Sequence, residues 1–202
     1  MNSLADCTLQ RFPVRKSELD RFKFGKRVYY QIAHSNEGHH LLCLDVACGA
    51  KPFPKADVVC DLNALPVKDR SMKQLETNGK PFVLCSCYNL PFKAEAFDFV
   101  TSYYLLEHLA YPWMFYSELR RVAKHGFIQC PTWLNELLYG EDVHSWIVLK
   151  QDNRLFVKPT GDGKQKFALG FVFHRLYRFR TWQLLHAMID EITHLFTVTF
   201  SF

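Results

Sequence analysis

The stretch LLCLDVACG, residues 41–49, is a short apolar run that ends in an acid and a turn of small residues. A continuous apolar run of this length, bounded by turn signals, is typical of a strand buried on both faces, as in a parallel sheet. Four further runs of the same kind follow it along the chain: 56–62, 81–86, 97–104 and 126–130. The sequence therefore predicts five buried strands in one sheet.

Helical signals separate most of these runs. Helices are predicted over four ranges: 17–33, 71–79, 111–124 and 171–192. The third has the clearest pattern, because Pro112 suits a first turn and Gly126 suits a stop. Its apolar residues recur at helical spacing on one face: Tyr111, Phe115, Leu119 and Val122. Strands that alternate with helices indicate an α/β fold with a doubly wound, mostly parallel sheet.

Two departures from a regular α/β alternation are expected. Only 12 positions separate Gly49 from Asp61, and Pro52 and Pro54 lie between them, so the first helix is predicted to be shortened or missing. Two later runs, 144–150 and 154–159, predict a β-hairpin after the fifth strand. The chain then ends on LFTVTFSF, whose alternation favours a half-buried strand.

These patterns predict a single unit with an appendage. We expect an N-terminal arm and helix over residues 1–35, followed by one α/β domain over 36–202 with the hairpin insertion at 132–170. The length of 202 residues is enough to bury a core without disulfides or metals.

Composition narrows the class of protein. Hydrophobic residues make up 49% and charged residues 22% of the chain, which is a globular balance. We expect no membrane span, because no apolar run reaches 18 residues, and no secretory signal. The odd count of seven Cys favours free thiols and a cytoplasmic protein. The net charge of +5 permits an anionic partner without requiring one.

Candidate ligand-binding residues follow the predicted strands. In open α/β sheets, ligands bind beyond the carboxyl ends of the strands. Asp45 and the small-residue turn after it end the first strand, and Asp61 ends the second, where an acid can accept ribose hydroxyls. Polar pairs end the third and fourth strands: Ser86 with Cys87, and Ser102 with Tyr103.

These segments together resemble the class I S-adenosylmethionine-dependent methyltransferases, specifically those of type 11. The residues that carry the resemblance are LDVACG (44–49), CDL (60–62), NLPFKAEAFDFVTSYYLLEHL (89–109) and ELRRVAKHGFIQCP (118–131). The glycine motif alone is weak, but the last three segments correspond to stretches of the family in order and at suitable spacing. The resemblance covers residues 41–131 and implies methyl transfer from S-adenosyl-L-methionine to an acceptor.

The resemblance also implies a role for each matching residue. Asp45 and the turn Ala47-Cys48-Gly49 would hold the methionine end, and Asp61 the ribose. Ser86 and Cys87 would frame the adenine, and Ser102 and Tyr103 would close over the amino-acid portion. If the acceptor must lose a proton, His108 and His144 are the candidate bases.

Two residues depart from the family's pattern. Ala47 stands where a glycine is usual, and an alanine there is expected to need a negative φ. Ser86 replaces the acid that commonly meets the adenine amino group, though its hydroxyl can still form a hydrogen bond.

Several functions remain open. An acceptor that is a small molecule is the leading hypothesis, and a non-catalytic relative that binds a partner is the second. The basic-aromatic segment 171–182 leaves RNA methylation possible but unsupported. A dinucleotide dehydrogenase is weaker, because the glycine motif is incomplete and Pro52 follows it. No metal site is predicted, since the pair Cys85-x-Cys87 lacks partners at ligand spacing.

Overall fold

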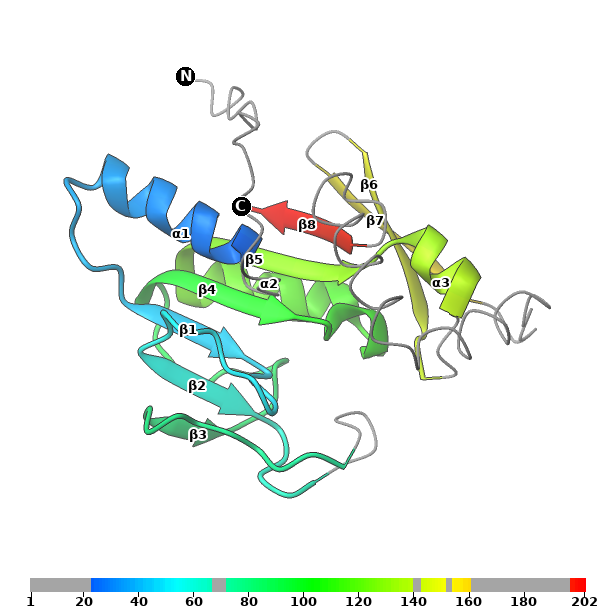
Figure 1. Ribbon diagram of the computed structural model, residues 1–202, viewed down its shortest axis with the longest axis horizontal. Helices are drawn as coiled ribbons and strands as arrows, with labels where there is room; N and C mark the ends of the chain where they lie inside the picture. The colour runs from blue at the N-terminus through cyan, green and yellow to red at the C-terminus, as the bar shows by residue number, and fades with distance from the viewer. Residues whose placement is uncertain (1–22, 67–71, 140–142, 152–153, 161–196) are drawn as a thin grey trace, which may run out of the picture.

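The computed structural model describes residues 23–66, 72–139, 143–151, 154–160 and 197–202. These residues form a six-stranded sheet of order β3-β2-β1-β4-β5-β8 (Figure 1). The first five strands are parallel, and β8 pairs with β5 in the antiparallel sense. The predicted doubly wound, mostly parallel α/β fold is therefore confirmed.

All five buried strands lie where the sequence places them. Their bounds are β1 Cys43–Val46, β2 Val58–Asp61, β3 Phe82–Leu84, β4 Phe97–Tyr103 and β5 Ala123–Pro131. The last strand, β8, spans Thr197–Ser201. β4 is central, and almost every residue of it is buried, which accounts for its unbroken apolar run.

Among the described residues, one helix covers each face of the sheet (Figure 1). α1, Lys23–Ser35, presents Gly25, Tyr29 and Ala33 to the sheet at four-residue spacing. Gly25 belongs there because a Cβ would overlap the Tyr103 hydroxyl. The predicted helix start at residue 17 lies outside the described residues.

α2, Pro112–Val122, covers the opposite face, and buries the Phe115, Leu119 and Val122 side chains. Tyr111 does not belong to this buried face as predicted, because it precedes the helix and is 51% exposed. The helix also ends earlier than predicted, since β5 begins at Ala123. Gly126 is thus a strand residue and not a helix stop.

A salt-bridged pair within α2, Glu118 and Arg121, forms hydrogen bonds with the NLPF turn, residues 89–92. The Arg121 guanidinium donates to both oxygens of the Glu118 carboxylate, from Nε at 2.8 Å and from Nη2 at 2.7 Å. Arg121 also donates to the carbonyl oxygens of Leu90 and Phe92, and Glu118 accepts from the Leu90 amide. The NLPF and ELRRV segments are therefore in direct contact, which gives their co-occurrence a physical basis.

The connection after β1 contains no helix. Residues 47–57 form turns, which confirms the missing first helix, and Phe53 from this segment packs fully buried against Tyr29 and Tyr103. Ala47 has φ +59°, so the expectation of a negative φ is wrong. The turn uses the left-handed conformation at Ala47 and again at Gly49, φ +59°.

The helix predicted over 71–79 is also wrong for its described part. Residues 72–79 form turns at both ends and irregular backbone between them, with positive φ at Met72, Asn78 and Gly79. The Glu76 amide donates to the Gly49 carbonyl, so this segment lies along the turn after β1.

The hairpin after β5 is confirmed and forms a sheet of its own. β6, Trp146–Gln151, pairs with β7, Arg154–Pro159, and a bridge from Thr132 to Val148 links it to the end of β5. A short helix, α3 Trp133–Tyr139, precedes the hairpin and was not predicted. The helix predicted over 171–192 lies outside the described residues. No helix in the described part of the chain is long and apolar enough to cross a membrane.

We predict that Gly126→Ala destabilises the protein by about 1–3 kcal/mol, because the new methyl group overlaps the Phe202 ring. Phe202 exchanges backbone hydrogen bonds with Gly126 and packs on Tyr116, so its ring has little room to move. Urea unfolding of both single variants and of the Gly126→Ala/Phe202→Ala pair measures the coupling. Additive effects in this cycle would contradict the clash.

We also predict that Ala47→Gly stabilises the protein by about 0.5–1 kcal/mol. Relief of the left-handed alanine, roughly 1–2 kcal/mol, outweighs the added chain entropy of glycine, about 0.4–1 kcal/mol. Ala50→Gly is the matched control, since Ala50 lies in the same turn without a positive φ and should lose stability instead. Equal shifts of the two melting curves would rule out strain at Ala47.

Candidate functional site

Asp45 is buried at the carboxyl end of β1, where its carboxylate holds neighbouring segments together. One oxygen accepts the Phe53 amide at 2.7 Å, and the other accepts the Thr101 hydroxyl at 2.9 Å. The side chain is only 1% exposed. These bonds make Asp45 a residue that shapes the turn after β1, and its predicted contact with a ligand stays a prediction.

The turn after β1 is tied to the end of β2 through Asp61. The half-buried Asp61 carboxylate accepts the Gly49 amide at 3.1 Å and the Asn63 amide at 3.0 Å. The Cys48 amide in turn donates to the Cys60 carbonyl. Ala47, Cys48, Gly49 and Asp61 therefore meet at one edge of the sheet, and their binding of a nucleotide-type ligand stays a prediction.

Two thiols near this edge, those of Cys48 and Cys87, are poor nucleophiles. Burial raises the pKa of Cys48 to about 12 and that of Cys87 to about 11, so both stay protonated at neutral pH. Ser86, between β3 and the NLPF turn, accepts the Tyr88 amide through its hydroxyl. Ser86 and Cys87 thus line the end of β3, next in the sheet to Asp61.

Ser102 and Tyr103 point to opposite faces at the end of β4. Ser102 aligns with Val46 of β1, and its buried hydroxyl has no hydrogen-bond partner within the described ranges. Tyr103 faces α1, with its ring among Phe53 and Phe127. The structure therefore places Ser102, and not Tyr103, on the side of the sheet that carries α2.

Directly after β4, the chain turns sharply at Tyr104, which has φ +56°. The Tyr104 amide donates to the Gln129 carbonyl, and its hydroxyl accepts from the Gln129 side chain, both at 2.8 Å. This anchored turn leads into the 3₁₀ helix η2, Leu106–His108.

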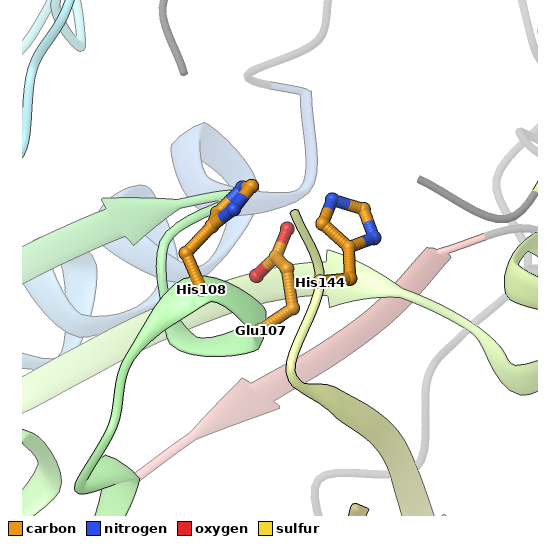
Figure 2. A group of neighbouring side chains, drawn as sticks. All are labelled: Glu107, His108 and His144. Atoms are coloured by element: carbon orange, nitrogen blue, oxygen red, sulfur yellow. The ribbon is translucent and has the colours of Figure 1, made fainter. Parts of the chain in front are cut away.

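η2 and the segment before β6 bring three polar side chains together: Glu107, His108 and His144 (Figure 2). The rings of His108 and His144 lie 4.6 Å apart between centroids, and the Glu107 carboxylate points between them. The Ser145 amide donates to the Glu107 carbonyl, which fastens the two segments. The two histidines named from the sequence are thus neighbours, although 36 positions separate them.

Burial dominates the electrostatics of this cluster. Glu107 is 1% exposed, and neither oxygen of its carboxylate has a hydrogen-bond partner by distance and angle among the residues described. Burial raises the pKa of Glu107 to about 7, against the opposing effects of its own backbone amide and His144. The Cys130 thiol beside it is also buried, and its pKa is raised well above the usual value.

A fourth residue, Glu136 of α3, holds His144. Its Oε1 lies 2.6 Å from His144 Nδ1, and both side chains are at most 10% exposed. Sequence reasoning did not single out Glu107 as a ligand or Glu136 at all. The motif LEHL was visible, but nothing in the sequence shows that α3 and the segment before β6 fold back onto it.

Comparisons with known proteins give the chain its relatives. The profile of the family described as "Methyltransferase domain" matches residues 44–128. An uncharacterized methyltransferase of Schizosaccharomyces pombe is 27% identical over 113 residues, which cover 54% of this chain. The match spans 41% of that relative, so the chain corresponds to less than half of its length.

Solved structures resemble the chain at low identity. A chain of the Haloferax volcanii complex that contains the methyltransferase activator Trm112 is 16% identical, with a TM-score of 0.44, over 94% of this chain and 98% of its own length. A methyltransferase-type structure from Bacillus halodurans is 22% identical, with a TM-score of 0.35, over 46% of each chain.

The profile match can be placed on the fold. The profile match begins in β1 and ends in β5, so it covers the five parallel strands that carry the Asp45–Asp61 edge. The matched segment contains the strands in the order β3-β2-β1-β4-β5, and β8 adds to it beside β5 in the antiparallel sense. Residues 44–128 therefore match the methyltransferase domain family, and the described part of the chain has a doubly wound, Rossmann-like α/β fold.

Proposed function

We propose that the chain binds S-adenosyl-L-methionine at the Asp45–Asp61 edge and transfers its methyl group to a small-molecule acceptor. The observation that carries the proposal is the bond from the Gly49 amide to Asp61. It places a carboxylate at the end of β2 against a left-handed turn at the end of β1. This is the arrangement in which α/β folds accept a ribose.

The polar groups at this edge fit such a ligand. Asp61 has carboxylate lone pairs to accept hydroxyl protons, and it is half-buried, so such bonds would be shielded from water. The buried Ser102 hydroxyl at the end of β4 would gain a partner from a polar ligand. Ala47, Cys48 and Gly49 would line the methionine end, while Ser86 and Cys87 would frame the base.

The chemistry asked of the protein is mainly positioning. When bound, S-adenosyl-L-methionine supplies a methyl group already activated on a sulfonium sulfur. The chain would hold the acceptor's nucleophilic atom in line with that methyl group, which is an effect of proximity and orientation. A proton that leaves the acceptor would go to His108 or His144, which lie beyond the end of β4 on the same carboxyl edge.

We predict that Asp61→Ala weakens S-adenosyl-L-methionine binding by about 10- to 100-fold, the effect of losing hydrogen bonds to a charged acceptor. Calorimetry of the wild type and the variant, with S-adenosylhomocysteine as a second ligand, measures this loss. Asp61→Asn removes the negative charge but keeps the shape of the side chain, and its side-chain oxygen can still accept the Gly49 amide. A loss of affinity in this variant would therefore come from the lost charge.

Asp98→Asn is the matched control for this experiment. Asp98 also accepts a backbone amide, that of Leu42, but it lies at the amino end of β4, on the opposite edge of the sheet. Its variant should bind both ligands as the wild type does. A wild type that binds neither ligand at high micromolar concentration would refute the proposed function. Unchanged affinity in Asp61→Ala would refute the ribose assignment.

A further inference from the structure

The cluster after β4 has the composition of a metal site. Glu107, His108 and His144 each offer one ligand atom, and these atoms all lie within 4.8 Å of one another. A tetrahedral zinc ion with bonds of about 2.0–2.2 Å holds its ligands roughly 3.3–3.6 Å apart. Small side-chain movements would therefore bring the three atoms onto one ion.

The Glu107 carboxylate is the independent observation that points to a cation. It is buried between the two imidazoles, and neither oxygen has a hydrogen-bond partner within the described part of the chain (Figure 2). A buried carboxylate is unfavourable unless new partners replace its hydration, and among the described residues Glu107 has for this only its own backbone amide, the weak thiol donor of Cys130 and the neighbouring His144. A bound cation would supply the missing interaction.

Glu136 supplies the outer contact that metal-bound histidines usually have. Its carboxylate lies 2.6 Å from His144 Nδ1, so a neutral His144 would donate from Nδ1 and present Nε2 toward Glu107 and His108. A carboxylate behind a ligating histidine fixes the tautomer and the direction of the ring. The two carboxylates of the cluster would also balance the charge of a divalent ion.

We propose that Glu107, His108 and His144 bind one divalent transition-metal ion, with Glu136 as the residue that orients His144. Two imidazoles and one carboxylate form the mixed nitrogen–oxygen set that zinc and its first-row neighbours accept. Three protein ligands leave a coordination position for a further oxygen or nitrogen atom. The site lies on a different part of the carboxyl edge from the Asp45–Asp61 pair, after β4 and not after β1 and β2.

One consequence rests on the proposed function. An acceptor that places an oxygen atom on the ion would lose its proton more readily, because a divalent cation stabilises the oxyanion that forms. With the ion bound, the proton would pass to solvent in place of the imidazoles, which would serve as ligands; His108 and His144 would act as bases only in the metal-free chain. The site would then select acceptors with an oxygen nucleophile.

The test is a calorimetric titration of the untagged full chain with zinc chloride. We expect one ion per chain in the wild type and at least about a 100-fold loss of affinity in Glu107→Gln and in His144→Ala. Glu136→Gln should lose about 10- to 100-fold, the range for residues behind a metal ligand. His39→Ala is the control, because His39 is 78% exposed and distant in sequence from the cluster, and it should bind zinc as the wild type does.

The outcomes separate this proposal from the proposed function. No zinc binding in the wild type, or equal binding in all the variants, would overturn the metal site. If a variant fails to fold, the X-ray absorption spectrum of the zinc-loaded wild type still tests the site. The spectrum should show two imidazole ligands on the ion, and a spectrum without them would overturn the metal site. Zinc binding without S-adenosyl-L-methionine binding would refute only the proposed function, and the converse would refute only the metal site.

Discussion

The buried Asp45 carboxylate is the interaction on which the carboxyl edge of the sheet depends. It joins β1 to β4 through the Thr101 hydroxyl, at a position where the two strands are already paired, and it joins β1 to the Phe53 amide beyond the turn. A charged group this deep in the protein is tolerable only because hydrogen bonds from both sides replace its water. The bond to Phe53 takes the place of the helix that would otherwise follow β1 and fix the turn.

The arrangement of the rest of the edge follows from this attachment. With Phe53 packed under α1, the turn at residues 47–50 is held against the end of β2, where Asp61 accepts the Gly49 amide. Pairing of β1 with β4 then places the end of β4 beside the turn, and the strained backbone at Tyr104 turns the chain from β4 into η2. Ala47 and Tyr104 both have a positive φ. The first begins the turn that carries the candidate cofactor residues, and the second precedes η2 with Glu107 and His108.

The parallel core could be predicted from the sequence because its signals are local. Each strand is a continuous apolar run, and Pro52 and Pro54 exclude a regular helix after β1. What could not be predicted depends on contacts between distant segments. Residues 72–79 carry a helical cap signal but form no helix, and the Glu76 amide donates to the Gly49 carbonyl instead. Gly126 must lack a side chain because the Phe202 ring lies over it. The metal-type cluster combines η2, α3 and the segment before β6, whose meeting leaves no pattern in the sequence.

The central claim is that the chain binds a methyl donor where β1 and β2 end. A crystal structure of the chain grown with S-adenosylhomocysteine tests this most directly. The account predicts that the ribose hydroxyls lie within hydrogen-bond distance of the Asp61 carboxylate, with the amino-acid end of the ligand against residues 47–50. A ligand bound elsewhere on the chain, or no bound ligand at saturating concentration, would contradict it.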